Sequence, residues 1–224
     1  ADRCEFLRKL PFILSCVVKE EISSHRIFRC IQSTHRIMIH CAEHAVVQSD
    51  EAVGDIGTAG SLVNVVGGIV GRKLIVEQDE AWYDFLMDVN MRSVFLCTRE
   101  VVPMMTEGGS IINFSSQAAR DGGGPGASMY ATAKAAVMCH TRSMAKELGP
   151  QGIRVNALAP GMINTSFHDR FTKPEARENL HKSAPLRREG EAYEIADLVC
   201  YLASDESSYI TGTNIDINGG CLFS

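Results

Sequence analysis

A tyrosine and a lysine four residues apart are the side chains of this sequence with the clearest chemical potential. Tyr130 and Lys134 lie in the segment 127–148, which has helical periodicity and ends at a Gly-Pro stop. They therefore share one face of a helix, about one turn apart. Of the five tyrosines, only Tyr130 has a lysine at this spacing. A phenol has an ordinary pKa of about 10, and a nearby ammonium group lowers it by stabilising phenolate. The pair predicts a proton donor for a carbonyl group that is being reduced.

Polar residues from two other segments could complete such a site. Ser116 follows the apolar stretch 110–115, and Asn90 lies in the preceding helical segment. A serine hydroxyl can hold a carbonyl oxygen in line with a proton donor. An amide can anchor a water molecule that links a lysine to solvent. The expected catalytic residues are Asn90, Ser116, Tyr130 and Lys134.

The elements that must position these residues alternate between strands and helices from residue 54 onward. Strands are expected at 61–66, 110–115, 152–158 and 215–217, and helices around 82–89 and at 127–148 and 191–204. The fold class is therefore α/β: a Rossmann-like, doubly wound parallel sheet with helices on both faces. Ligands of such sheets bind outside the carboxyl ends of the strands. The polar segment 164–190 is expected to be a mobile lid or short helices.

Length and composition favour one soluble domain over residues 1–224. The formal net charge of -5 argues against nucleic acid as a partner. No apolar stretch approaches the roughly 18 residues that a membrane span needs. We therefore expect a cytoplasmic protein with neither a membrane nor a nucleic-acid partner.

At these residues the sequence resembles the short-chain dehydrogenase/reductase family, over about 57–220. The family's Asn-Asn-Ala-Gly element is similar to the segment from Asn64 to Gly67, with a changed middle, and its Pro-Gly turn matches Pro160-Gly161. The resemblance implies NAD or NADP as cofactor, a small carbonyl or alcohol substrate, and a homo-oligomer, either a tetramer or a dimer. Asn64 could equally serve to tie neighbouring strands by hydrogen bonds. The cofactor-binding residues that the resemblance implies are Asn64, Gly67, Tyr130, Lys134, Pro160, Gly161 and Thr165.

Two glycine-rich stretches are similar to particular subgroups of this family. The segments 67–73 and 121–126 resemble 3-oxoacyl-carrier-protein reductases, and, together with 165–168, reductases of the keto-uronate released from alginate. The substrate would then be a sugar-derived keto acid or a 3-oxoacyl compound. Arg72 and Arg120 could receive a carboxylate, or they could be solvated or make subunit contacts. The expected substrate-binding residues are Arg72, Ser116, Gln117 and His168.

The amino-terminal part departs from the family pattern. The family's first strand leads into a Thr-Gly-x-x-x-Gly-x-Gly turn for the pyrophosphate, but residues 1–53 contain none of the 19 glycines. We therefore divide the single domain into an atypical segment, 1–53, and a catalytic and substrate-binding part, 54–224. The atypical segment could be an aberrant translation, a divergent half with strands at 10–18 and 36–40, or the mark of a non-catalytic relative.

Two alternatives to an intact enzyme remain at this point. Without the phosphate-binding turn, the chain could be a catalytically impaired relative that acts as an oligomerisation module. Four cysteines and four histidines in the first 44 residues could also suggest a metal site, but their irregular spacing disfavours one. We expect no metal.

Overall fold

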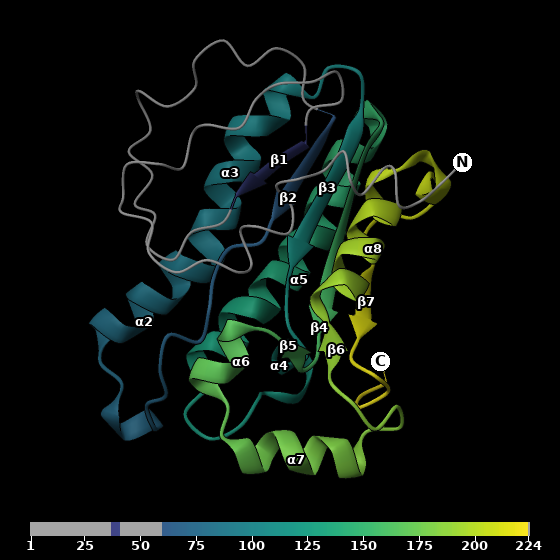
Figure 1. Ribbon diagram of the computed structural model, residues 1–224. Coiled ribbons are helices and arrows are strands. Elements are labelled where there is room, and N and C mark those ends of the chain that lie inside the picture. The colour runs from purple at the N-terminus through teal and green to yellow at the C-terminus, as the bar shows by residue number, and fades with distance from the viewer. Residues whose placement is uncertain (1–36, 41–59, 224) are drawn as a thin grey trace.

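A parallel five-stranded sheet forms the centre of the computed structural model, which describes residues 37–40 and 60–223 (Figure 1). Every pair of neighbouring strands is parallel, and their order is β1-β2-β3-β4-β7. This arrangement confirms the expected α/β class. The strands are β1 (Ile37–His40), β2 (Ser61–Asn64), β3 (Gly109–Phe114), β4 (Ile153–Pro160) and β7 (Asn214–Ile217).

From β2 onward, helices connect successive strands of the large sheet, as parallel pairing requires. A π-helical segment, Asp88–Arg92, joins α2 to α3 without a break. A second, two-stranded sheet pairs β5 (Ile163–Asn164) with β6 (Gly190–Glu191). The helices are α2 (Glu80–Met87), α3 (Ser93–Val101), α4 (Ala118–Asp121), α5 (Ser128–Leu148), α6 (Ser166–Phe171), α7 (Pro174–Ser183) and α8 (Ala192–Ala203).

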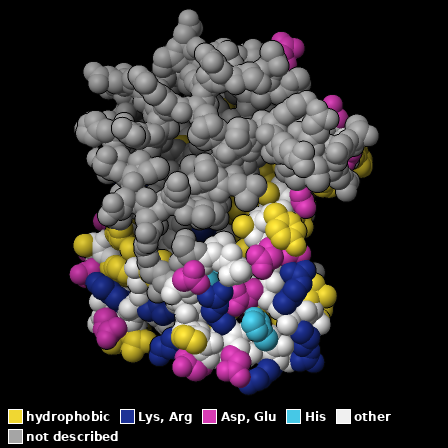
Figure 2. Space-filling view, in the orientation of Figure 1, with side chains coloured by type: hydrophobic (Ala, Val, Ile, Leu, Met, Phe, Trp, Pro, Cys, Tyr) yellow, Lys and Arg dark blue, Asp and Glu magenta, His cyan; other side chains and the backbone are white. Residues whose placement is uncertain are grey.

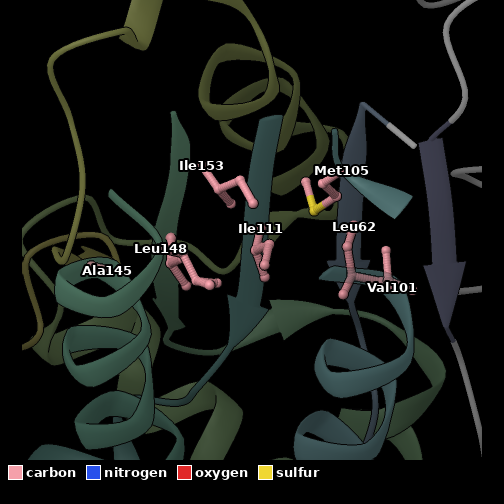
Figure 3. Packing of buried hydrophobic residues seen from close by; sticks show 8 residues of the cluster. Leu62, Val101, Met105, Ile111, Ala145, Leu148 and Ile153 are labelled. Carbon is pink, nitrogen blue, oxygen red and sulfur yellow. The ribbon is translucent and has the colours of Figure 1, made fainter. Parts of the chain in front are cut away.

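One face of the sheet packs against α3 and α5. Successive side chains of a strand point to opposite faces, so that Leu62, Ile111 and Val155 contribute to the same cluster. Val101 of α3 and Leu148 of α5 complete it, and Figure 3 shows Leu62, Val101, Ile111 and Leu148 around the strands. Full burial of such a side chain stabilises the fold by about 1.5–3 kcal/mol.

The opposite face of the sheet packs against α8. Val63 and Ile112 immediately follow residues of the first cluster in their strands and therefore point the other way. They meet Ile195, Val199 and Leu202, which recur at helical spacing along α8. The two clusters make the three-layer arrangement that the alternating strands and helices predict.

Several boundaries differ from the sequence expectation. The strand expected at 61–66 ends at Asn64, and the Val66 carbonyl accepts a hydrogen bond from the Lys134 ammonium. The loop expected before Tyr130 contains α4, whereas the short helices expected as one alternative at 164–190 are present as α6 and α7. The strand expected at 36–40 is present as β1, whereas the one at 10–18 lies outside the described residues.

Figure 2 shows both signs of charge on the described part of the surface. There, acidic and basic side chains are interspersed over the part of the molecule around α7. Within the described ranges, the helices are all too short or too polar to cross a membrane.

Candidate active site

A cavity of about 420 Å³ lies at the carboxyl ends of β2, β3 and β4, beneath α6 and α7. This is the place that a parallel sheet of this class predicts for a ligand. Asn64 and Asn90 are completely buried and do not belong to its lining. The other ten expected site residues line it: Gly67, Arg72, Ser116, Gln117, Tyr130, Lys134, Pro160, Gly161, Thr165 and His168.

Tyr130 and Ser116 meet inside this cavity. Tyr130 lies in the first turn of α5, and Ser116 lies between β3 and α4. Burial raises the pKa of the phenol, and a hydrogen bond with the Ser116 hydroxyl opposes this by lowering it. The Ser116 oxygen also accepts from the backbone N–H of Ala118 at 3.2 Å. The phenol is therefore protonated at neutral pH and lies beside a second hydroxyl group.

Lys134 is buried, with 3% of its surface exposed, and binds backbone carbonyls. Its ammonium donates to the Val66 oxygen at 3.0 Å and to the Phe114 oxygen at 2.8 Å, just past β2 and at the end of β3. Burial lowers its pKa to about 7. The sequence led us to expect that Lys134 lowers the pKa of Tyr130, whereas the lowering contribution here comes from Ser116. Lys134 thus connects the loop after β2 to the end of β3 at the cavity wall.

Asn90 holds the loop that follows β2. Its side-chain oxygen accepts from the Gly68 N–H at 3.0 Å, and its amide donates to the Gly68 carbonyl at 3.1 Å and to the Leu86 carbonyl at 2.9 Å. It lies in the π-helical segment, a feature that is frequent at functional sites. The expected water link to lysine stays a prediction, since the contacts of Asn90 are with backbone groups.

Asn64 belongs to a buried chain of amides and hydroxyls. Its amide donates to the Asn113 side-chain oxygen at 2.8 Å, and the Asn113 amide donates to the Thr141 hydroxyl at 3.0 Å. These bonds connect β2, β3 and α5. They agree with the interpretation that Asn64 ties strands together, and its contact with a cofactor stays a prediction.

The two arginines that we considered as carboxylate receptors have protein partners. Arg72 lines the cavity, but its guanidinium donates to the Pro125 carbonyl at 3.1 Å. Arg120 does not line the cavity: it binds the Asp216 carboxylate at 2.7 Å and the Asn214 carbonyl at 2.8 Å. The suggestion that Arg120 receives a substrate is therefore wrong, because its side chain fastens α4 to β7.

His168 belongs to α6, which together with α7 covers one side of the cavity; we call these two helices the lid. Its Nδ1 atom is 2.7 Å from the Thr172 hydroxyl oxygen. Burial lowers its pKa, whereas the Glu189 carboxylate and a hydrogen bond with the Gly161 backbone raise it. The imidazole thus links α6 to the turn that follows β4, and it is one of the lining residues that the sequence predicted.

Sequence reasoning missed the apolar wall that α6, α7 and α8 contribute. The segment 164–190 is polar overall, so its few apolar residues carried little weight. Phe167 and Phe171 are nevertheless four residues apart, which places them on one face of a helix. The spacing of these two phenylalanines is the sequence feature that could have predicted the apolar wall. The apolar residues of the wall include Met162, Ile163, Phe167, Phe171, Leu180 and Val199.

Two glycines of the cavity wall are fixed by the packing of the protein itself. A Cβ atom on Gly67 would lie 2.2 Å from the Asn90 side-chain oxygen, and one on Gly161 would lie 2.7 Å from the Asn218 Cβ, so no side chain has room at either position. The wall therefore presents backbone rather than a side chain to a ligand at Gly67 and Gly161. The described residues hold no glycine-rich turn from a first strand into a helix for the pyrophosphate. Over the same residues, no three His, Cys, Asp or Glu side chains could hold a metal ion.

Comparison with known proteins gives the family. The family model described as Enoyl-(Acyl carrier protein) reductase matches residues 39–221. The 3-oxoacyl-[acyl-carrier-protein] reductase FabG of Thermotoga maritima is 42% identical over 173 residues, 76% of this chain and 69% of that protein. The FabG of Staphylococcus aureus is 38% identical over 181 residues, 80% of this chain and 72% of that protein.

Solved structures of reductases are also similar to this chain. The crystal structure of NADH-dependent reductase A1-R', responsible for alginate metabolism, matches with a TM-score of 0.67 and 33% identity, covering 75% of this chain and 66% of that one. A mutant of that protein, titled a DEH reductase, matches with the same TM-score and 32% identity, over the same shares of the two chains. The chain therefore spans just under two thirds of the length of these two structures. By its sequence and its fold, the chain belongs to the short-chain dehydrogenase/reductase family.

Proposed function

We propose that this chain is a nicotinamide-dependent reductase that interconverts a carbonyl and a secondary alcohol. One observation carries the proposal: the Tyr130 phenol, hydrogen-bonded to Ser116, faces the same cavity as Lys134 one helical turn away. The family membership supports it. The FabG proteins to which the chain is similar are named as reductases of 3-oxoacyl groups.

In this proposal Tyr130 is the general acid. When bound, the reduced nicotinamide supplies the hydride that adds to the carbonyl carbon. The Ser116 hydroxyl binds the carbonyl oxygen and orients it toward Tyr130. The phenol donates its proton to that oxygen as negative charge develops. The raised pKa of Tyr130 keeps this proton in place at neutral pH, which suits reduction better than oxidation.

Lys134 and Asn90 act on the shape and charge of the site. Lys134 keeps the loop after β2 and the end of β3 together and lines the same cavity as Tyr130. Asn90 is a positioning residue, because it holds Gly68 from outside the cavity lining. Gly67, Pro160, Gly161 and Thr165 would form the nicotinamide end of the cofactor site, with NAD and NADP both open.

The substrate that fits best carries an apolar arm next to its carbonyl group. Phe167, Phe171 and Leu180 line the lid side of the cavity, and Met162 and Val199 continue this apolar wall. Burial of an acyl chain against these residues stabilises binding by roughly 25 cal/mol for each Å² of apolar surface. We therefore propose a 3-oxoacyl compound as the substrate.

A sugar-derived keto acid is the second candidate. The similarity to the reductase of alginate metabolism favours it. Gln117, with its amide, and Arg72 lie at the cavity wall, where they could receive hydroxyls or a carboxylate. Such binding would use the Nε or Nη2 donors of Arg72, because its bond to the Pro125 carbonyl comes from Nη1.

The test is turnover by the wild type and by Tyr130→Phe. Wild-type protein should oxidise NADH or NADPH with a 3-oxoacyl thioester, and Tyr130→Phe should lower kcat by about 10²- to 10⁴-fold, the usual contribution of a general acid. Tyr209→Phe is the control, because Tyr209 is fully exposed. Tyr130→Phe with wild-type kcat would contradict the mechanism. A keto-uronate reduced in preference to the thioester would favour the second candidate.

Absence of wild-type turnover with every carbonyl and both cofactors would favour the oligomerisation module instead. The homo-oligomer that the family implies stays a prediction under either function, and sedimentation velocity tests it.

A further inference from the structure

One guanidinium group on α7 joins the segments that cover the cavity. The Nε and Nη2 atoms of Arg177 each donate to the Glu189 carboxylate at 2.6 Å. Nη1 donates to Asp169 of α6 at 2.5 Å, and Nη2 also donates to the Asn164 side-chain oxygen at 3.1 Å. Arg177 thus connects α7 with α6, with β5 and with the chain just before β6.

The carboxylate at the centre of this cluster is buried. Glu189 is 8% exposed, and the hydrogen bonds from Arg177 hold its pKa below the usual value. A bidentate pair between a guanidinium and a carboxylate fixes both distance and orientation. A buried carboxylate that loses its partner is costly. The pair is therefore a rigid connection, unlike the ion pair between Lys182 and Glu178, which is exposed on both sides.

The same two helices supply one wall of the proposed substrate site. Phe167 and Phe171 of α6 and Leu180 of α7 line the cavity, and Leu180 lies three residues after Arg177, on a neighbouring part of the helix surface. The charges of Glu189 and Arg177 also act on His168, in opposite directions. Displacement of Arg177 would move this apolar wall and change the surroundings of His168.

We propose that Arg177 is a positioning residue for substrate: through Glu189 and Asp169 it holds α6 and α7 against the cavity. The apolar wall then has one fixed position, and the carbonyl substrate binds to a preformed surface. The inference rests on the proposed reductase function. It goes beyond that function because Arg177 and Glu189 lie outside the cavity lining and act through the residues that they hold.

The chain offers a matched control. Arg188 makes a bidentate pair of the same kind with Glu194, at 2.7 Å for both bonds, but this pair joins the loop before β6 to α8 rather than to the lid helices. Arg188→Met therefore removes a bidentate ion pair from the same region, although a more exposed one, and leaves the bonds between α6 and α7 in place.

The first measurement is the steady-state kinetics of Arg177→Met, Arg177→Lys, Glu189→Gln and Arg188→Met. Arg177→Met should raise KM for the carbonyl substrate at least about tenfold, with a smaller change in kcat, because a displaced binding wall costs affinity more than it costs proton transfer. Arg177→Lys should recover part of the loss. Glu189→Gln should resemble Arg177→Met, and Arg188→Met should keep the wild-type KM.

The second measurement needs no catalysis. Chymotrypsin should cut native Arg177→Met within the lid, after Phe167, Phe171 or Leu180, at least about tenfold faster than it cuts wild type or Arg188→Met, with the fragments identified by mass. If the wild type is active and Arg177→Met has its cutting rate and its KM, then the role of Arg177 is wrong. The proposed function would still stand. Faster lid cutting together with no wild-type turnover would overturn the proposed function, and with it the role of Arg177 toward substrate.

Discussion

At the scale of single residues, Gly67 has almost no freedom to change. Its φ is +111°, and an added Cβ would lie 2.2 Å from the Asn90 side-chain oxygen and 3.1 Å from the Lys134 Nζ. Gly67→Ala should therefore lower the free energy of unfolding by about 1–3 kcal/mol and should reduce reductase activity by displacing Asn90 and Lys134.

The neighbouring glycine supplies the control for this prediction. A Cβ on Gly68 would find its nearest neighbour, the Phe167 ring, at 3.8 Å, which is ordinary contact. Urea denaturation of Gly68→Ala should give nearly the wild-type value. Equal losses in the two variants would mean that the close approach between Gly67 and Asn90 does not constrain the site.

Lys134 should make stability depend on pH in the alkaline range. Its pKa falls from 10.5 to about 7 on folding, so between these values the unfolded chain binds more protons than the folded one. The free energy of unfolding therefore rises as pH increases through this window, and the gain is lost as pH falls toward 7. Tyr130 acts oppositely, but only above its ordinary pKa, because its folded pKa is raised.

Denaturation between about pH 7.5 and 9.5 separates this contribution from that of Tyr130. Lys134→Met should flatten the rise of stability with pH, whatever its effect on stability at any one pH. Lys146→Met is the control, since Lys146 is exposed on the same helix. An unchanged pH slope in Lys134→Met would show that Lys134 keeps its ordinary pKa in the fold.

The chemistry of single residues was partly predictable from the sequence. The spacing of Tyr130 and Lys134 was enough to place both at one cavity, because helical geometry is local. The partners of Arg120 were not predictable, because Asp216 lies 96 residues further along the chain. The bonds of Lys134 to backbone carbonyls carry no sequence signal, since every residue has a carbonyl.

At the scale of elements, buried amides join β2 and β3 to α5. Asn64 and Asn113 share a hydrogen bond of 2.8 Å, and Asn113 continues to Thr141. Removal of one partner leaves the other unsatisfied in the core, so Asn64→Ala and Asn113→Ala should each cost about 1–3 kcal/mol of unfolding free energy.

A double-mutant cycle tests whether this connection is direct. Denaturation of both single variants and of the double variant should give a coupling energy of about 0.5–3 kcal/mol, because the second removal no longer leaves an unpaired group. Purely additive losses would mean that the two asparagines stabilise their strands independently.

The longest elements were predictable, although length alone did not decide: the four-residue β7 was expected, whereas the nine-residue α3 was not. The long helix α5 and the buried strands β3 and β4 have enough residues for a hydrophobic period to emerge, and the sequence located all three. By contrast, β5 and β6 have two residues each, which is too short for any period. The π-helical segment around Asn90 has the same composition as ordinary helix, so its position also had no signal.

At the scale of the whole molecule, the chain offers candidate binding residues for the nicotinamide end of a dinucleotide but no recognisable turn for its pyrophosphate. In the proposed function, the nicotinamide end would meet Gly67, Gly161 and Thr165, which line the cavity. The pyrophosphate end depends in this family on a glycine-rich turn, and residues 1–53 contain no glycine. We therefore predict that the chain as written binds NADH and NADPH more weakly than micromolar.

Calorimetry with whole and half cofactors tests this asymmetry. A phosphate-binding turn makes a dinucleotide bind far more tightly than nicotinamide mononucleotide, because backbone N–H groups hold the second phosphate and the adenylate adds contact area. If that turn is missing, reduced nicotinamide mononucleotide and NADH should differ in Kd by less than about tenfold, or 1.4 kcal/mol. Micromolar NADH binding, with the mononucleotide much weaker, would mean that glycine-free backbone in this chain holds the pyrophosphate.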